Sequence, residues 1–452
     1  MWNRPLPEKY NCIQKTKEQR SRKMSVNREL LDFIKRSPTA FQAVATAEDV
    51  LKKKGFTELR ESVKWVLEKS GKYYTKKNGS SLIAFEIPEG DFSGFMMTAA
   101  HGDNPSFKIK ENAEQKNDVY VRLSTESYGG GIYSTWLDRP LSVAGRIIVC
   151  DGNGFSTKLV DMQEPVAVIP NLCIHFNRDA NTGLNLNPAV DMVPLLKDAG
   201  EGKSFRGMIA EKAGVNEEDI LSTDLFLYNP QEGIEWSDYI SSPRLDDLQS
   251  AFALLKGFIN SKPSKAVKVY CLFDNEEVGS GTKQGAASTF LSDVLERIAD
   301  CFGLTKEERI RKLACSFMVS CDNGHAVHPN HPEVSDPNHA PKMNKGVVIK
   351  YNASQRYTTD AVSAAVFQLV CEKAKVPVQM FFNRADIRGG GTLGNISTTQ
   401  VSVNSVDIGL AQLAMHSSFE TAGAKDTEYL VKAITAYYGK QFIQTENGYT
   451  LE

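Results

Sequence analysis

The sequence predicts an α/β fold, in which a catalytic domain with a central mixed sheet is interrupted by an inserted β-rich domain. The chain has 452 residues, more than one ordinary hydrophobic core holds. After Ser241, strand-like apolar runs alternate with helical patterns, which is typical of an α/β sheet. Between about Asp103 and Asp238 the runs are short, β-like and separated by Gly and Asn. We therefore expect residues 1–102 and 239–452 to form the catalytic domain and residues 103–238 the insertion.

The elements follow from local patterns. Apolar residues recur at helical spacing from Leu30 to Leu51 and stop at Gly55, which predicts a helical opening that ends at a glycine. Asn78-Gly79 predicts a hairpin, followed by a strand that ends at His101. The β-like runs of the insertion are 119–123, 147–149 and 166–169. After it we expect helices from 248, near 291, at 361–373 and at 427–438, and strands at 267–273, 316–320 and 378–382.

Composition excludes several classes of protein. A formal net charge of -2 argues against nucleic-acid binding, and no apolar run is long enough for a membrane span. The eight cysteines form no CxxC pair, and Cys150, Cys271 and Cys371 lie in apolar runs, which predicts reduced, buried thiols in a cytoplasmic protein. Residues 1–23 are basic and polar without the apolar core of a secretory signal, so we interpret them as a solvated extension.

The most informative motif is DNEEVGS, which directly follows the apolar run 267–273. Its neighbouring carboxylates Glu276 and Glu277 repel each other unless a positive charge lies beside them, and a divalent metal is the usual solution. One Glu would then bind metal while the other transfers protons. Alone, the motif is more typical of a solvated acidic turn.

Four other polar segments carry residues of metal-ligand type next to apolar runs. His101 and Asp103 lie two apart, as suits a His ligand oriented by a carboxylate. Asp246 starts a helical pattern and, taken singly, is equally an N-cap. The remaining candidates are Asp322, His325 and His328 in CDNGHAVHPN, and His416 in LAMHS. All seven histidines fall in or close to such polar segments, which favours a metal site over scattered structural histidines.

Ordered blocks along almost the whole chain, from about Leu30 to Tyr438, resemble the M18 metallopeptidases. These blocks include HGDNPSFKIK, SPRLDDLQS, DNEEVGS, CDNGHAVHPN and LAMHS. The resemblance implies a split catalytic domain and an insertion used in dimerisation or as a lid. It also implies two divalent ions, one held by His101 and Asp322 and the other by Glu277 and His416, with Asp246 bridging them.

In this resemblance Glu276 is the general base, and Asp103 is counted with the catalytic residues as the carboxylate that orients His101. Histidine and carboxylate ligands without thiolate suit zinc, with cobalt or manganese as alternatives. The implied reaction is removal of N-terminal residues from short peptides. Rival hypotheses are a related two-metal deacetylase or amidohydrolase, and an inactive assembly protein. The second is disfavoured because every ligand position holds a competent residue.

Substrate preference rests on fewer residues. Lys350 and Tyr357 match positions that contact an acidic substrate side chain in aspartyl aminopeptidases, and His328 is a further expected substrate-binding residue. Two departures keep a neutral preference open, as in the aminopeptidase I branch. The chain reads RADIRGGGTLGN where aspartyl members carry a Gly-Thr-Thr-Ile-Gly-Pro-like run, and it has Asp247 where Asn is common.

One histidine is expected to act outside its own subunit. His175, in CIHFN of the insertion, matches a histidine that reaches into a neighbouring site in the family. Locally it is equally a half-buried strand histidine. The resemblance implies a homo-oligomer built from dimers, up to a closed tetrahedral dodecamer.

Overall fold

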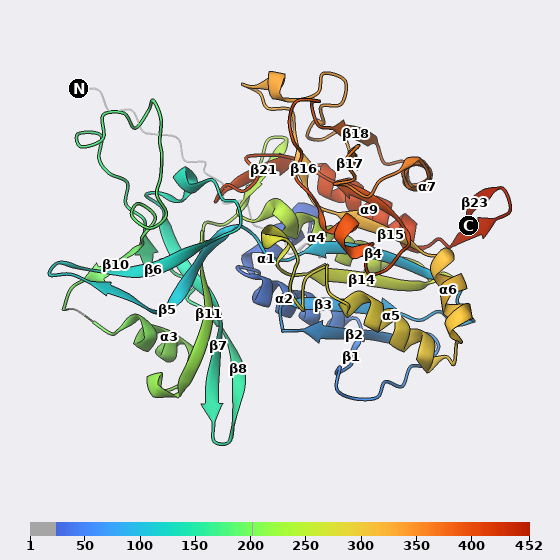
Figure 1. Ribbon diagram of the computed structural model, residues 1–452, viewed down its shortest axis with the longest axis horizontal. Coiled ribbons are helices and arrows are strands. Elements are labelled where there is room, and N and C mark those ends of the chain that lie inside the picture. Colours follow the sequence, from blue (N-terminus) through green and yellow to red (C-terminus); the bar gives the residue numbers. More distant parts are fainter. Residues whose placement is uncertain (1–23, 201) are drawn as a thin grey trace, which may run out of the picture.

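A nine-stranded mixed sheet forms the centre of the larger part of the molecule (Figure 1). The computed structural model describes residues 24–200 and 202–452, so the extension predicted at residues 1–23 lies outside the described residues. Strand order is β1-β2-β3-β14-β4-β15-β19-β17-β18, and β14, β4, β15 and β19 run parallel to their neighbours within this group. The strands are β1 (Thr57–Glu58), β2 (Lys72–Lys77), β3 (Ser81–Glu86), β4 (Phe95–His101), β14 (Val267–Phe273), β15 (Phe317–Cys321), β17 (Val347–Tyr351), β18 (Val378–Phe382) and β19 (Asn404–Gly409).

Helices cover both faces of this sheet. One buried cluster joins the sheet to α1 (Val26–Lys35), α2 (Ala40–Lys53), α4 (Leu245–Asn260), α7 (Ala361–Ala374) and α9 (Asp426–Tyr438). The other cluster involves α5 (Phe290–Cys301), α6 (Lys306–Ala314) and α8 (Leu393–Ser397). The central strands are buried on both sides, so they read as continuous apolar runs rather than alternating ones.

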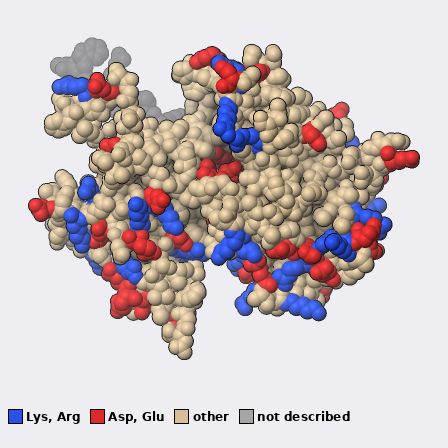
Figure 2. Space-filling view, in the orientation of Figure 1, with Lys and Arg blue, Asp and Glu red and all other residues tan. Residues whose placement is uncertain are grey.

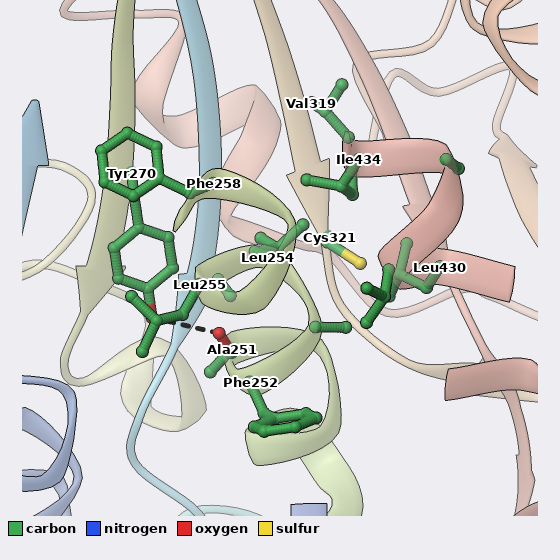
Figure 3. Close-up of a cluster of buried hydrophobic side chains, with 14 of the residues drawn as sticks. Ala251, Phe252, Leu254, Leu255, Phe258, Tyr270, Val319, Cys321, Leu430 and Ile434 are labelled. Carbon is green, nitrogen blue, oxygen red and sulfur yellow. Dashed lines mark hydrogen bonds between the residues drawn. The ribbon is translucent and has the colours of Figure 1, made fainter. Parts of the chain in front are cut away.

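Helix α4 packs between the sheet and α9, as Figure 3 shows. Tyr270 on β14 stacks on Phe258 of α4, and its hydroxyl donates a hydrogen bond to the Ala251 carbonyl at 3.1 Å. These buried contacts hold α4 against the sheet. This matters because Asp246 lies in the first turn of that helix.

A separate seven-stranded antiparallel sheet lies beside the first part (Figure 1). It comprises β5 (Ser106–Lys116), β6 (Tyr120–Tyr128), β7 (Pro140–Asp151), β8 (Gly154–Asp161), β9 (Ala167–Val168), β10 (Leu195–Asp198) and β11 (Ile220–Tyr228). Helix α3 (Phe205–Ala213) packs on it and shares its buried core. All of its strands fall inside the predicted insertion, although the division into domains with boundaries at 102 and 239 stays a prediction.

A small five-stranded sheet lies near the carboxyl ends of the central strands. Its order is β12 (Ile234–Trp236), β13 (Tyr239–Ser242), β21 (Glu420–Gly423), β20 (Ala411–Leu413) and β16 (Gly324–His325). The chain ends in a hairpin of β22 (Phe442–Thr445) and β23 (Gly448–Leu451), and short 3-10 turns lie at Tyr133–Trp136 (η1), Glu217–Asp219 (η2), Glu276–Val278 (η3) and Pro332–Val334 (η4). The helices of the described part of the chain are all too short or too polar to cross a bilayer.

The predicted helical opening consists of two helices, α1 and α2, because Pro38 lacks the N–H that a continuous helix would need. One sequence prediction about the thiols was wrong. Cys150 is exposed rather than buried, since it lies at the end of β7 beside a turn, whereas Cys271 and Cys371 are buried as expected. The seven cysteines within the described ranges are all free thiols. The Asn78-Gly79 hairpin is confirmed between β2 and β3.

Candidate metal centre

The predicted ligands gather where neighbouring central strands end. His101 is the last residue of β4, Asp322 directly follows β15, and Glu277 lies in η3 just after β14. Asp246 comes from the first turn of α4, and His416 from the turn after β20. Because the carboxyl ends of parallel strands meet at one edge, residues far apart in sequence converge there.

The five residues form two groups that share one member. His101, Asp246 and Asp322 have potential ligand atoms within 4.8 Å of one another, and so do Asp246, Glu277 and His416. The two oxygens of Asp246 face different histidines. Asp246 Oδ1 lies 3.6 Å from His101 Nε2, and Asp246 Oδ2 lies 3.3 Å from His416 Nε2. One carboxylate therefore lies between two possible ion positions.

Both histidines are oriented through their other ring nitrogen. His101 Nδ1 lies 3.1 Å from the Asp103 carbonyl oxygen, and His416 Nδ1 lies 3.0 Å from the Gly130 carbonyl oxygen. A carbonyl only accepts, so each Nδ1 donates its proton to the carbonyl, and each Nε2 faces the carboxylates. This is the usual arrangement of metal-binding histidines.

The charges at this site fit a divalent cation. Asp246 Oδ1 and Glu277 Oε1 are buried without a hydrogen-bond partner. Burial raises the pKa of Glu277 well above its usual range, with the Asp246 charge adding to the effect, and burial raises the pKa of Asp322 to about 6. Burial alone would lower the pKa of His416, yet its hydrogen bond to Asp246 and the charge of Glu277 raise it to about 10. Cations bound here would take over the neutralisation that protons otherwise supply.

Glu276 lies beside the cluster without belonging to either ligand group. Burial raises its pKa to about 8; the charge of His101 opposes this shift and the charge of Asp322 adds to it. Asp103 holds the backbone here, because its two oxygens accept the N–H groups of Glu276 and Glu277 at 3.1 and 3.2 Å. Tyr128 from the seven-stranded sheet donates its hydroxyl to Asp103 at 2.7 Å. The Asp103 carboxylate therefore supports the two glutamates as well as lying 3.4 Å from His101 Nδ1.

Lys350 is a buried residue next to the cluster, rather than a surface lysine at a strand end. It is only 2% exposed, its ammonium lies 3.7 Å from Asp322 Oδ1, and it donates to the Asn323 carbonyl at 3.1 Å. The ammonium also lies 5.3 Å from the ring centroid of Tyr357, which is buried. The two predicted substrate-binding residues therefore contact each other and the edge of the metal cluster.

The other predicted site residues lie outside the two ligand groups. His328 is half-buried in a loop, where its Nδ1 accepts the Asn330 N–H and its ring faces His331. His325 is the last residue of β16, three positions after Asp322, and its ring packs at a steep angle against Phe381. His175 is exposed in a turn of the segment between β9 and β10, rather than half-buried in a strand.

Sequence reasoning missed three buried residues that hold the ligands. Asp247 accepts the N–H groups of His101 and Asn323, both at 3.3 Å. Glu420 accepts those of Asp246 and His416. Asn323 donates its side-chain amide to Leu245, Gln249 and Gln412. Asp247 could have been identified from the sequence, because it stands next to Asp246 in SPRLDDLQS. The local sequence around Glu420, FETAG, carries no such signal.

Figure 2 shows acidic side chains gathered in a recess near the middle of this face, with basic side chains close above them. Convergent histidines and carboxylates at the carboxyl edge of an α/β sheet, beside a further buried glutamate, define a metallohydrolase. The comparisons with known proteins specify the class. Residues 33–438 match the family described as Aminopeptidase I zinc metalloprotease (M18), and the chain belongs to this family. It is thus a zinc metallo-aminopeptidase, a hydrolase that removes N-terminal residues from peptides.

Relatives match along nearly their whole length. The chain is 47% identical to a probable M18 family aminopeptidase 2 of Clostridium novyi over 429 residues, which cover 92% of this chain and 99% of that protein. A second protein so named, from Clostridium acetobutylicum, is 45% identical over 91% of this chain and 98% of its own. Among solved structures, the Ape4 chain of a complex with Nbr1 has a TM-score of 0.88 at 32% identity, covering 92% of this chain and 85% of that chain.

Proposed function

We propose that this aminopeptidase uses two divalent ions, most consistent with zinc. His101 and Asp322 would hold one ion, Glu277 and His416 the other, and Asp246 would bridge them. The observation that carries the proposal is the placement of Asp246, whose two oxygens each face a different histidine Nε2. When bound, such ions polarise a peptide carbonyl and make water a stronger acid.

Glu276 is the proposed general base. It lies next to the cluster and is not needed as a ligand, so its carboxylate can exchange a proton with a water molecule there. Its backbone is held by Asp103, which keeps the carboxylate at the edge of the cluster. Glu276 would accept a proton from the attacking water and pass it to the leaving amine.

We further propose a preference for N-terminal Asp or Glu. Support comes from Lys350, a buried ammonium at the cluster edge beside the Tyr357 ring, since such a group pairs well with a desolvated carboxylate. A specific observation favours the competing neutral preference: the ammonium already lies 3.7 Å from Asp322 and donates to Asn323. Hydrolysis of otherwise identical peptides beginning with Asp, Glu, Leu and Met decides between them.

The proposed assembly is a homo-oligomer in which His175 reaches a neighbouring copy. His175 lies between the exposed apolar residues Ile174 and Phe176, and Leu172 is exposed nearby. Exposed apolar side chains of this density indicate a contact surface. One similar solved structure, at 28% identity and a TM-score of 0.81 over 92% of this chain and 96% of that chain, is described as the S. cerevesiae mApe1 dodecamer. Light scattering on the protein, with Phe176→Asp as the interface variant, tests the assembly.

A further inference from the structure

Glu420 is a buried carboxylate that is not in either ligand group, yet it connects two of the ligands. It is 2% exposed and lies at the start of β21. Its Oε2 accepts the backbone N–H of Asp246 at 3.0 Å, and its Oε1 accepts the backbone N–H of His416 at 2.8 Å. Each oxygen of one side chain therefore holds the main chain of a different ligand.

The small five-stranded sheet explains why Glu420 lies there. Strand β21 pairs with β13 in the register Ser242↔Glu420, and the chain continues from β13 to Asp246. On its other side β21 pairs with β20, from which the chain continues to His416. The two ligand-bearing segments thus leave neighbouring strands on either side of Glu420, and the carboxylate spans the gap between them.

The first ligand group has its own support. Asp247 accepts the N–H groups of His101 and Asn323, the residue after Asp322. Apart from Asp246, which both groups share, Glu420 reaches the first group only through the Gln412 side chain, which donates to Glu420 at 3.3 Å and accepts from Asn323 at 2.8 Å. Loss of Glu420 would therefore act first on the second group.

We propose that Glu420 is a positioning residue that sets the placement of Asp246 relative to His416, and so determines the affinity of the second ion. This inference rests on the proposed two-ion function. Without the carboxylate, two buried backbone donors lose their acceptors, and the two segments must move to find others. Residues that hold metal ligands in this way commonly change metal affinity by 10- to 100-fold when replaced.

The test is zinc binding to metal-free protein, measured by equilibrium dialysis, in wild type and Glu420→Gln. A glutamine offers one acceptor oxygen and places its amide NH2, which only donates, against the other backbone N–H, so it cannot hold both segments. We expect wild type to bind two ions. In E420Q one ion should bind as in wild type and the other about 10- to 100-fold more weakly.

Asp426→Asn is the matched control. Asp426 is also fully buried and accepts two backbone N–H groups, from Asn344 at 2.6 Å and Gly346 at 3.0 Å, but belongs to neither ligand group. D426N should lower the melting temperature while both zinc affinities stay unchanged. His416→Ala, which removes a ligand of the second group, should retain one ion with the affinity of the ion retained by E420Q.

Unchanged binding of both ions in E420Q, or equal weakening of both, would overturn the role of Glu420. A wild type that binds only one ion would instead overturn the two-ion function itself. If E420Q does not fold, Glu420→Asp replaces it, because aspartate keeps the charge but is too short to reach both N–H groups. E420D should then show the same selective weakening, and normal binding of both ions would refute the proposal.

Discussion

Replacing Lys350 by Met tests what this buried ammonium does. Met has nearly the same length and fits an apolar environment, so the change removes charge with little change of volume. If the ammonium receives the first side chain of the substrate, the Lys350→Met enzyme should lose activity on N-terminal Asp and Glu peptides and keep it on Leu peptides.

The magnitude follows from the position of the ammonium. Removing one partner of a buried charge pair costs roughly 2–5 kcal/mol, because the other charge stays desolvated. Lys350 already lies 3.7 Å from Asp322, and this negative charge offsets part of the attraction between the ammonium and a substrate carboxylate. The expected cost is therefore at the lower end of this range. About 2 kcal/mol corresponds to roughly thirtyfold in kcat/KM for acidic substrates. For a Leu substrate we expect a change within about threefold, because no charge on the substrate is left unpaired.

The assay compares kcat/KM for Asp, Glu and Leu peptides in wild type and variant at saturating zinc. Lys268→Met is the matched control, since Lys268 is also 2% exposed and pairs with Glu86 at 2.9 Å, at the opposite end of β14 from the cluster. It should lose stability without a change of substrate ratio. An equal fall on acidic and neutral substrates in K350M would show that Lys350 supports Asp322 rather than the substrate. A wild type that prefers Leu would refute the acidic assignment.

Three further outcomes are expected. Glu276→Gln should keep its zinc content and lose at least about a hundredfold in kcat, because Gln cannot accept a proton; normal turnover in the zinc-replete variant would remove Glu276 from the mechanism. Asp246→Ala should lose bound metal, measured by elemental analysis, and full occupancy would contradict the bridging role. Metal-free protein should melt roughly 5 °C lower at pH 9 than at pH 6 in scanning calorimetry. The raised pKa of Glu276 costs stability progressively as the pH rises from 4.5 to about 8, and stability contributed by protonated His416 is lost as the pH rises from 6.5 toward about 10. Zinc should flatten this dependence, and a metal-free protein that is more stable at pH 9 would show the opposite sign.

Most of the correct fold predictions came from segments with a strong local sequence pattern. The strand at 267–273 was predicted with its observed bounds, because a run buried on both faces is continuously apolar. Helix α6 was missed because none of its residues is buried, so its sequence has no apolar stripe to detect. The five-stranded sheet was missed for another reason: β16 and β20 have two and three residues, too few for a periodic signal.

The site residues also divide into those with a local sequence signal and those without one. The proposed ligands could be picked out from the sequence because histidines and carboxylates next to apolar strands are rare combinations, and their role as ligands stays a prediction. Residues that support them through the backbone, such as Glu420, carry no local signal, since their partners are 174 positions away in the case of Asp246. Within the turn of glycines 129–131, the backbone comes close to the site at Gly129. Its φ is +72°, and a Cβ there would lie 3.1 Å from Glu277 Cβ.

Through the hydrogen bond from His416 to Gly130, the antiparallel sheet helps to orient one of the proposed metal ligands. The turn after β6 supplies the carbonyl that fixes the ring, and Ile132 returns a hydrogen bond from its N–H to the His416 carbonyl at 3.0 Å. A shortened chain that kept only the nine central strands would leave this imidazole free to rotate. Neither sheet can therefore be exchanged between relatives as a self-contained unit, and substitutions near residues 128–132 and near 416 must remain compatible with one another.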